Sequence, residues 1–148
     1  YQIEVKLNLI EKKFNPENGW EVSVDIDGME KGDKYSQKRK IADECIKEMK
    51  KLGVKIGNEE RIDIIAKHRN HRTYYIEVEG KARKQIEQRV YSALGQIIFK
   101  MKSRNIKNGI AVPYDNKWEE KLEQIPKSVR ERLNLRLYLV AKNKVKSL

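Results

Sequence analysis

A mixed α/β fold, in which helices cover a central β-sheet, is predicted by three features of this 148-residue sequence. Short extended segments alternate with longer helical segments along most of the chain. Hydrophobic residues make up 39% of the chain, which is enough to fill one core, whereas charged residues make up 37% and can cover its surface. Because a chain of this length usually folds around one core, we expect residues 1–148 to form a single domain.

An N-terminal β-hairpin is predicted over residues 1–30. Residues 2–9 and 20–26 each alternate polar and apolar side chains, as half-buried strands do. Residues 15–19 between them (NPENG) are rich in turn-forming side chains. We interpret this hairpin as an addition to a core that spans residues 36–140.

A helix followed by three extended segments opens the predicted core. Ser36 can cap this helix at its start, and Gly53 follows its end near Leu52. The three extended segments cover residues 54–56, 61–66 and 73–79.

An amphipathic helix and two further strands complete the predicted core. Apolar residues recur at the spacing of one helix face from residue 82 to about residue 104. A buried strand is expected at residues 110–112 and a last strand at residues 135–140. Short helices at residues 118–124 and 128–133 separate these two strands, so a mixed sheet covered by helices is favoured.

The balance of charges is strongly basic. Lys and Arg total 33 against 22 Asp and Glu, which gives a net charge of +11 at pH 7. Such a surface attracts phosphate polyanions, so we expect DNA as the partner, with RNA and branched DNA as further options. The alternative is that the excess lysine only keeps the protein soluble.

Neither a membrane protein nor an exported one is indicated. No apolar run approaches the roughly 20 residues that span a bilayer, and the first residues lack the pattern of a signal peptide. The single cysteine, Cys45, cannot form a disulfide within the chain. We expect an intracellular, cytoplasmic protein.

Three carboxylates on two of the extended segments form the candidate site. Asp63 lies on the segment at residues 61–66, and Glu77 and Glu79 lie on the next one. Side chains alternate between the faces of a strand, so Glu77 and Glu79 share one side, and Lys81 joins them there if the strand continues. The alternative is that these acidic residues only form the solvated face of a half-exposed strand.

Clustered carboxylates repel each other unless a proton or a cation neutralises them. A hard ion such as Mg²⁺, with Mn²⁺ as its substitute, is therefore the expected cofactor of Asp63, Glu77 and Glu79. Such an ion can polarise a phosphate and lower the pKa of an attacking water. Together with the basic charge, this grouping predicts metal-dependent hydrolysis of phosphodiester bonds.

The order of these elements and acidic residues resembles the PD-(D/E)xK, or restriction-endonuclease-like, nuclease superfamily, over about residues 36–140. The resemblance implies an αβββαβ core, endonuclease activity on DNA, and metal binding by Asp63 and Glu77. It also implies a lysine that orients or activates the water, at the position that Glu79 occupies here. In a second register, Glu79-Gly80-Lys81 is the motif. Gln96, on the following helix, matches a glutamine that helps to position substrate or water in related nucleases.

Basic residues beside the predicted site are expected to contact the nucleic-acid backbone. They lie in the loop after Ala66 and at the start of the next helix, and they are Lys67, His68, Arg69, His71, Arg72, Arg83 and Lys84. A catalytically inactive nucleic-acid-binding or assembly domain of the same fold is the alternative function. A homodimer is a further option, because a cut across both strands of a duplex needs two sites.

Overall fold

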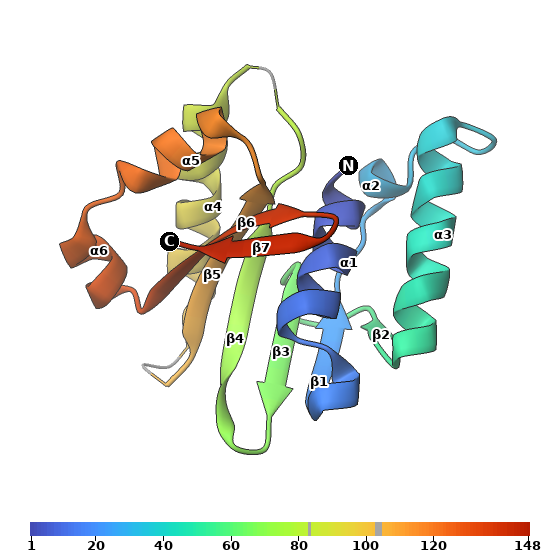
Figure 1. Cartoon of the computed structure of the whole chain (residues 1–148), viewed down its shortest axis with the longest axis horizontal. Helices are drawn as coiled ribbons and strands as arrows, with labels where there is room; N and C mark the ends of the chain where they lie inside the picture. Colours follow the sequence, from blue (N-terminus) through green and yellow to red (C-terminus); the bar gives the residue numbers. More distant parts are fainter. Residues whose placement is uncertain (83, 103–104) are drawn as a thin grey trace.

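The computed structural model describes residues 1–82, 84–102 and 105–148, apart from the side chains of His71 and Arg72. In these residues one sheet contains the strands β1 (Trp20–Val24), β2 (Lys55–Ile56), β3 (Ile64–His68), β4 (His71–Val78), β5 (Lys107–Pro113), β6 (Leu135–Ala141) and β7 (Lys144–Ser147). Their order across the sheet is β2-β1-β3-β4-β5-β6-β7 (Figure 1). Because β4, β5 and β6 run parallel while β1, β3 and β4 alternate in direction, the sheet is mixed, as predicted.

Helices cover both faces of this sheet, which confirms the predicted α/β class. They are α1 (Gln2–Lys13), the 3-10 turn η1 (Pro16–Asn18), α2 (Gly28–Lys31), α3 (Gln37–Leu52), α4 (Ile86–Lys100), α5 (Asn116–Glu123) and α6 (Lys127–Arg132). α1 and α3 lie on one face, and α4, α5 and α6 lie on the other (Figure 1). Among the described residues, no helix combines the length and hydrophobicity that a bilayer span requires.

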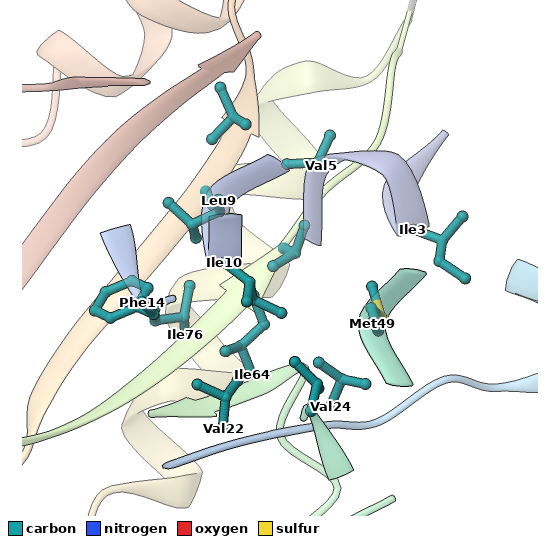
Figure 2. Close-up of a cluster of buried hydrophobic side chains, with 14 of the residues drawn as sticks. Ile3, Val5, Leu9, Ile10, Phe14, Val22, Val24, Met49, Ile64 and Ile76 are labelled. Carbon is teal, nitrogen blue, oxygen red and sulfur yellow. The ribbon is translucent and has the colours of Figure 1, made fainter. Parts of the chain in front are cut away.

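Two apolar clusters fill the spaces between the sheet and its helices. Figure 2 shows the cluster under α1, where Ile10 and Phe14 meet Ile64 and Ile76 of the sheet. The cluster on the other face joins α4 and α5 to β5 and β6. Both faces of β5 are therefore buried, and α4 also packs against the neighbouring strand β4.

The predicted N-terminal hairpin is wrong. Residues 2–9 belong to helix α1, so the strand Trp20–Val24 pairs instead with β2 and β3. The alternation of Ile3, Val5 and Leu9 resembled a strand, but Ile3 and Ile10 also lie at helical spacing, and the structure buries all four. Because α1 buries a wide face, its apolar residues include some at every second position, which is the pattern of a strand.

Most other predicted elements are present with shifted bounds. α3 begins after Ser36, whose side chain accepts a hydrogen bond from the Arg39 amide, and ends at Gly53, whose φ of +92° favours glycine. The extended segment at residues 54–56 is β2, but it lies at the sheet edge beside β1 and does not pair with β3. The C-terminal strand β7 was not predicted.

Candidate functional site

Asp63 and Glu77 lie opposite each other at one end of the β3–β4 pair. Ile64 pairs with Ile76 in this antiparallel pair, so Asp63, one residue earlier, lies opposite Glu77, one residue later. The Asp63 carboxylate accepts a hydrogen bond from the Val78 amide at 2.8 Å through Oδ2, and its carbonyl accepts one from the Asp25 amide at 3.1 Å. Asp63 is therefore held by the backbone of two different segments.

Glu77 is a buried acid whose surroundings raise its pKa. Its side chain is 5% exposed. Burial, the negative charge of Asp63 and a hydrogen bond between the two side chains together raise the pKa of Glu77 to about 8, although the Lys100 ammonium opposes the rise. Lys100 Nζ on α4 lies 3.3 Å from Glu77 Oε1 and donates to the Arg61 carbonyl at 2.7 Å.

Glu79 directly follows β4, and its side chain lies on the side of α4, as that of Glu77 does. Both acidic side chains meet α4: Arg89 Nη1 lies 3.4 Å from Glu79 Oε2, as Lys100 lies near Glu77. Burial raises the pKa of Glu79, the Arg89 guanidinium lowers it, and the Asp63 carboxylate raises it. Glu79 therefore forms an ion pair with Arg89, separate from the ion pair of Glu77 with Lys100.

A fully buried lysine, which the sequence analysis missed, completes the site. Lys6 Nζ on α1 lies 2.7 and 2.9 Å from the two carboxylate oxygens of Glu30, and 3.3 Å from Asp63 Oδ1. It also donates to the Asp25 carbonyl at 2.5 Å. Helical spacing in the sequence could have indicated that Lys6 is buried, because Ile3, Lys6 and Ile10 lie on one face of a helix.

Glu30, on the short helix α2, was also missed. Burial raises the pKa of Glu30, the Lys6 ammonium lowers it, and the Asp63 and Asp27 carboxylates raise it. Glu30 is 6% exposed, so its charge depends on Lys6 for compensation. The site therefore contains four carboxylates and three cations, drawn from α1, α2, the β3–β4 pair and α4.

Two other predicted residues lie close to this group without a described contact to its carboxylates. Lys81 lies on an open cleft of about 660 Å³ beside the group. This cleft is lined by Tyr1, Gln2, Glu4, Asp27, Met29, Glu30, Lys38, Gly80, Lys81 and Arg89. Gln96 is exposed on α4. It follows Arg89 by seven positions and precedes Lys100 by four, so the three side chains share one face of the helix.

The basic turn between β3 and β4 lies far from the carboxylates, contrary to expectation. It joins the strands at their opposite end (Figure 1), and a five-residue strand is about 16 Å long. Lys67 and Arg69 are exposed there, whereas the His68 ring packs on Trp20 and lies 3.0 Å from the Asn18 carbonyl. The side chains of His71 and Arg72, and all of Arg83, lie outside the described residues. Exposed Lys84 precedes α4 on the carboxylate side.

Asp63 and Glu77 are the neighbouring carboxylates that could contribute ligands to a divalent cation. In residues 1–82, 84–102 and 105–148 no three His, Cys, Asp or Glu side chains form a metal-binding group. The expected triad of carboxylates is therefore not formed. Mg²⁺, however, is commonly held by one or two carboxylates, with water and phosphate filling its other positions. Burial and the negative charge of Asp63 both raise the Glu77 pKa, and a divalent cation beside the two carboxylates would oppose both effects.

Comparison with known proteins adds no family assignment. No family model, curated protein or solved structure matches this chain.

The stability of the metal-free protein is expected to fall as the pH rises through neutrality. The pKa of Glu77 is ordinarily 4.5 and is about 8 in the folded protein. As the pH rises, the unfolded chain therefore loses this proton before the folded protein does. This contribution is fully present below pH 4.5 and is lost as the pH rises through about 8. Denaturant unfolding in EDTA across this range measures it. Glu77→Gln, which cannot titrate, should flatten the profile, and an unchanged profile in this variant would contradict the assignment.

Proposed function

We propose that this chain is a Mg²⁺-dependent endonuclease domain that hydrolyses phosphodiester bonds of DNA. The observation that carries the proposal is the Asp63–Glu77 pair, two opposed carboxylates, largely buried, at the end of adjacent strands. Carboxylates in this state bind hard divalent cations, and perturbed acids of this kind concentrate at functional sites. A net charge of +11 is consistent with a phosphate polyanion as substrate.

The order of the structural elements supports the resemblance to PD-(D/E)xK nucleases. Helix α1, the antiparallel strands β1, β3 and β4, helix α4 and the parallel strand β5 follow the order αβββαβ that the resemblance implies. The core then begins at α1, while α2, α3 and β2 are an insertion between β1 and β3. This assignment replaces the one in which the helix at Gln37–Leu52 opened the core.

The described side chains have separable roles in the proposed reaction. When bound, Mg²⁺ supplies a Lewis acid for the phosphate and lowers the pKa of a coordinated water. Asp63 and Glu77 would hold the ion, and the Val78 amide and Lys6 fix the two oxygens of Asp63. Glu79 occupies the position at which the motif has a lysine. Lys100 instead places an ammonium group beside Glu77. It stabilises the ionised form of Glu77, which metal binding requires.

The open cleft provides a path for the DNA backbone next to this pair. Its lining includes three cations, Lys38, Lys81 and Arg89, as well as the carboxylates of Glu4, Asp27 and Glu30. Cations along a cleft bind phosphates without reading sequence. The substrate would therefore approach between α2 and the segment after β4.

Incubation of the protein with plasmid, branched and single-stranded DNA tests this function. We expect cleavage of at least one substrate in Mg²⁺ or Mn²⁺ and none in EDTA. Cleavage that continues unchanged in EDTA, or no cleavage of any substrate with either metal, would count against the proposal.

The second candidate is a nucleic-acid-binding domain of this fold without catalysis. It is favoured by Glu79, which replaces the motif lysine and forms an ion pair with Arg89. Calorimetric titration with Mg²⁺ and Mn²⁺ separates the two candidates. The nuclease should bind metal, lose binding in Glu77→Gln and retain it in Glu87→Gln, a matched variant of an exposed glutamate on α4. Salt-sensitive DNA binding without any metal binding would favour the second candidate.

A further inference from the structure

Tyr35 is an exposed aromatic residue on the turn between α2 and α3. It is 91% exposed, and its φ of +67° is a backbone conformation that bulky residues rarely adopt. The Lys34 ammonium lies 5.2 Å from the centre of the Tyr35 ring, which is close enough for a cation–π contact. The ring therefore contributes almost nothing to the core, and its open face is available to a ligand.

The segment around Tyr35 is strongly basic. Residues 28–40 contain two acidic residues, Glu30 and Asp33, and five cations, Lys31, Lys34, Lys38, Arg39 and Lys40. Glu30 is buried against Lys6, and Arg39 pairs with Asp43, so the four lysines outweigh Asp33 at the surface of this segment. Cations beside an exposed aromatic ring complement a nucleic acid, because phosphates bind the cations while a base stacks on the ring.

The turn that carries Tyr35 adjoins the cleft beside the carboxylates. Met29 and Lys38 line this cleft of about 660 Å³, and they also line a second open hollow of about 500 Å³ together with Gly28, Gly32, Asp33 and Ser36. A Cβ atom on Gly32 would lie 3.0 Å from Lys38 Cβ, so the lack of a side chain there lets the stem of Lys38 lie directly against the end of α2. The second hollow therefore leads from the cleft to the turn next to Tyr35.

The same segment is linked to the proposed catalytic pair. Lys6 Nζ lies 2.7 Å from Glu30 Oε1 of α2 and 3.3 Å from Asp63 Oδ1. A DNA strand that follows the two hollows would therefore pass beside Asp63.

We propose that Tyr35 stacks on an unpaired base of the substrate while Lys34 and Lys38 bind its phosphates. Bases inside a duplex stack on one another, so a protein ring can stack on a base only in a single strand, at an end or after the base is flipped out. The preferred substrate is therefore DNA with unpaired nucleotides next to the cleft. This choice of substrate rests on the proposed function, whereas the stacking contact itself needs neither metal nor cleavage.

Equilibrium binding in EDTA tests the stacking contact without cleavage. Fluorescence anisotropy compares a labelled single strand of about 16 nucleotides with a blunt duplex of the same sequence. We expect the single strand to bind more tightly. Tyr35→Ala should weaken its binding at least about fivefold, which is the lower end of the effect of base stacking, and should leave the duplex affinity unchanged. Tyr35→Phe, which keeps the ring, should bind as the wild type does.

Phe99→Ala is the matched control for the loss of an exposed ring. Phe99 is 93% exposed, but it lies in a stretch, residues 90–99, that carries no charge, so this variant should bind as the wild type does. Circular dichroism checks that Tyr35→Ala remains folded, as the exposure of Tyr35 implies. A wild-type chain without preference for the single strand would overturn the proposal. So would a Tyr35→Ala chain that binds it normally, or that loses affinity for both probes equally.

The salt dependence of binding tests the two lysines. Lys34→Gln and Lys38→Gln should each lower the slope of log affinity against log salt by about 0.7 for the single strand, as loss of one phosphate contact does. Lys47→Gln, at an exposed position of α3 outside the basic segment, should leave the slope unchanged. Unchanged slopes in both of the first two variants would contradict the phosphate contacts.

The binding and cleavage results together separate this inference from the proposed nuclease activity. A chain that binds single strands through Tyr35 but cleaves no substrate in Mg²⁺ or Mn²⁺ would contradict the activity alone. A chain that cleaves intact duplex and single strands equally, with no effect of Tyr35→Ala on binding or rate, would contradict the stacking contact alone.

Discussion

Replacing Asp63 with asparagine is expected to lower the rate of metal-dependent DNA cleavage about a thousandfold or more. Asp63 is one of two opposed carboxylates available to an ion, and the substitution removes its charge with little change in shape. Each factor of ten in rate corresponds to about 1.4 kcal/mol, and the stabilisation that a bound metal gives a developing charge is several times that. Initial cleavage rates at saturating Mg²⁺ measure the effect.

The control for this variant is Asp43→Asn on α3. Asp43 is exposed and pairs with Arg39, so its loss should change neither cleavage nor folding. The Asp63 variant must be shown to be folded, because its carboxylate also contacts Lys6 and the Val78 amide. A folded Asp63→Asn protein that cleaves at the wild-type rate would remove Asp63 from the proposed site.

Strand alternation and hairpin adjacency were enough to bring Asp63, Glu77 and Glu79 to one end of the sheet. These are local properties of two strands that follow each other in the chain, and the structure shows both. The same local reasoning failed for the turn at residues 67–72. That turn adjoins the Asp63 strand in sequence, but the extended backbone of β3 carries it to the opposite end of the sheet.

The missed residues depend on contacts between distant parts of the chain. Lys6 and Glu30 are 24 positions apart, and Lys100 is 23 positions from Glu77. The packing of helices on the two faces of the sheet brings the members of each pair together. The periodicity of the sequence does not predict which residues meet in this way. The misread helix α1 removed Lys6 from consideration, because a strand would have placed it on the solvated face. An error in one element thus hid the principal cation of the site.

Replacing Lys6 with methionine is expected to destabilise the fold by about 3–5 kcal/mol at neutral pH. Lys6 is fully buried, and its ammonium is shared between Glu30 and Asp63. Removing one partner of a buried ion pair leaves charge without compensation, whereas replacing both partners with apolar groups can be nearly neutral. The free energy of unfolding in denaturant measures the loss. Lys12→Met, at an exposed position of α1, is the matched control and should change it little.

Two further measurements distinguish loss of charge from loss of packing in the Lys6→Met protein. The double variant with Glu30→Leu should recover part of the lost stability, because it removes one of the uncompensated carboxylates. The destabilisation should also shrink as the pH falls and the remaining carboxylates take up protons, since protonation removes the charge that Lys6 balanced. A loss that is the same at every pH, and that the double variant does not reduce, would mean that Lys6 acts through packing alone. Asp63 would then owe its orientation to the Val78 amide rather than to a charge buried under α1.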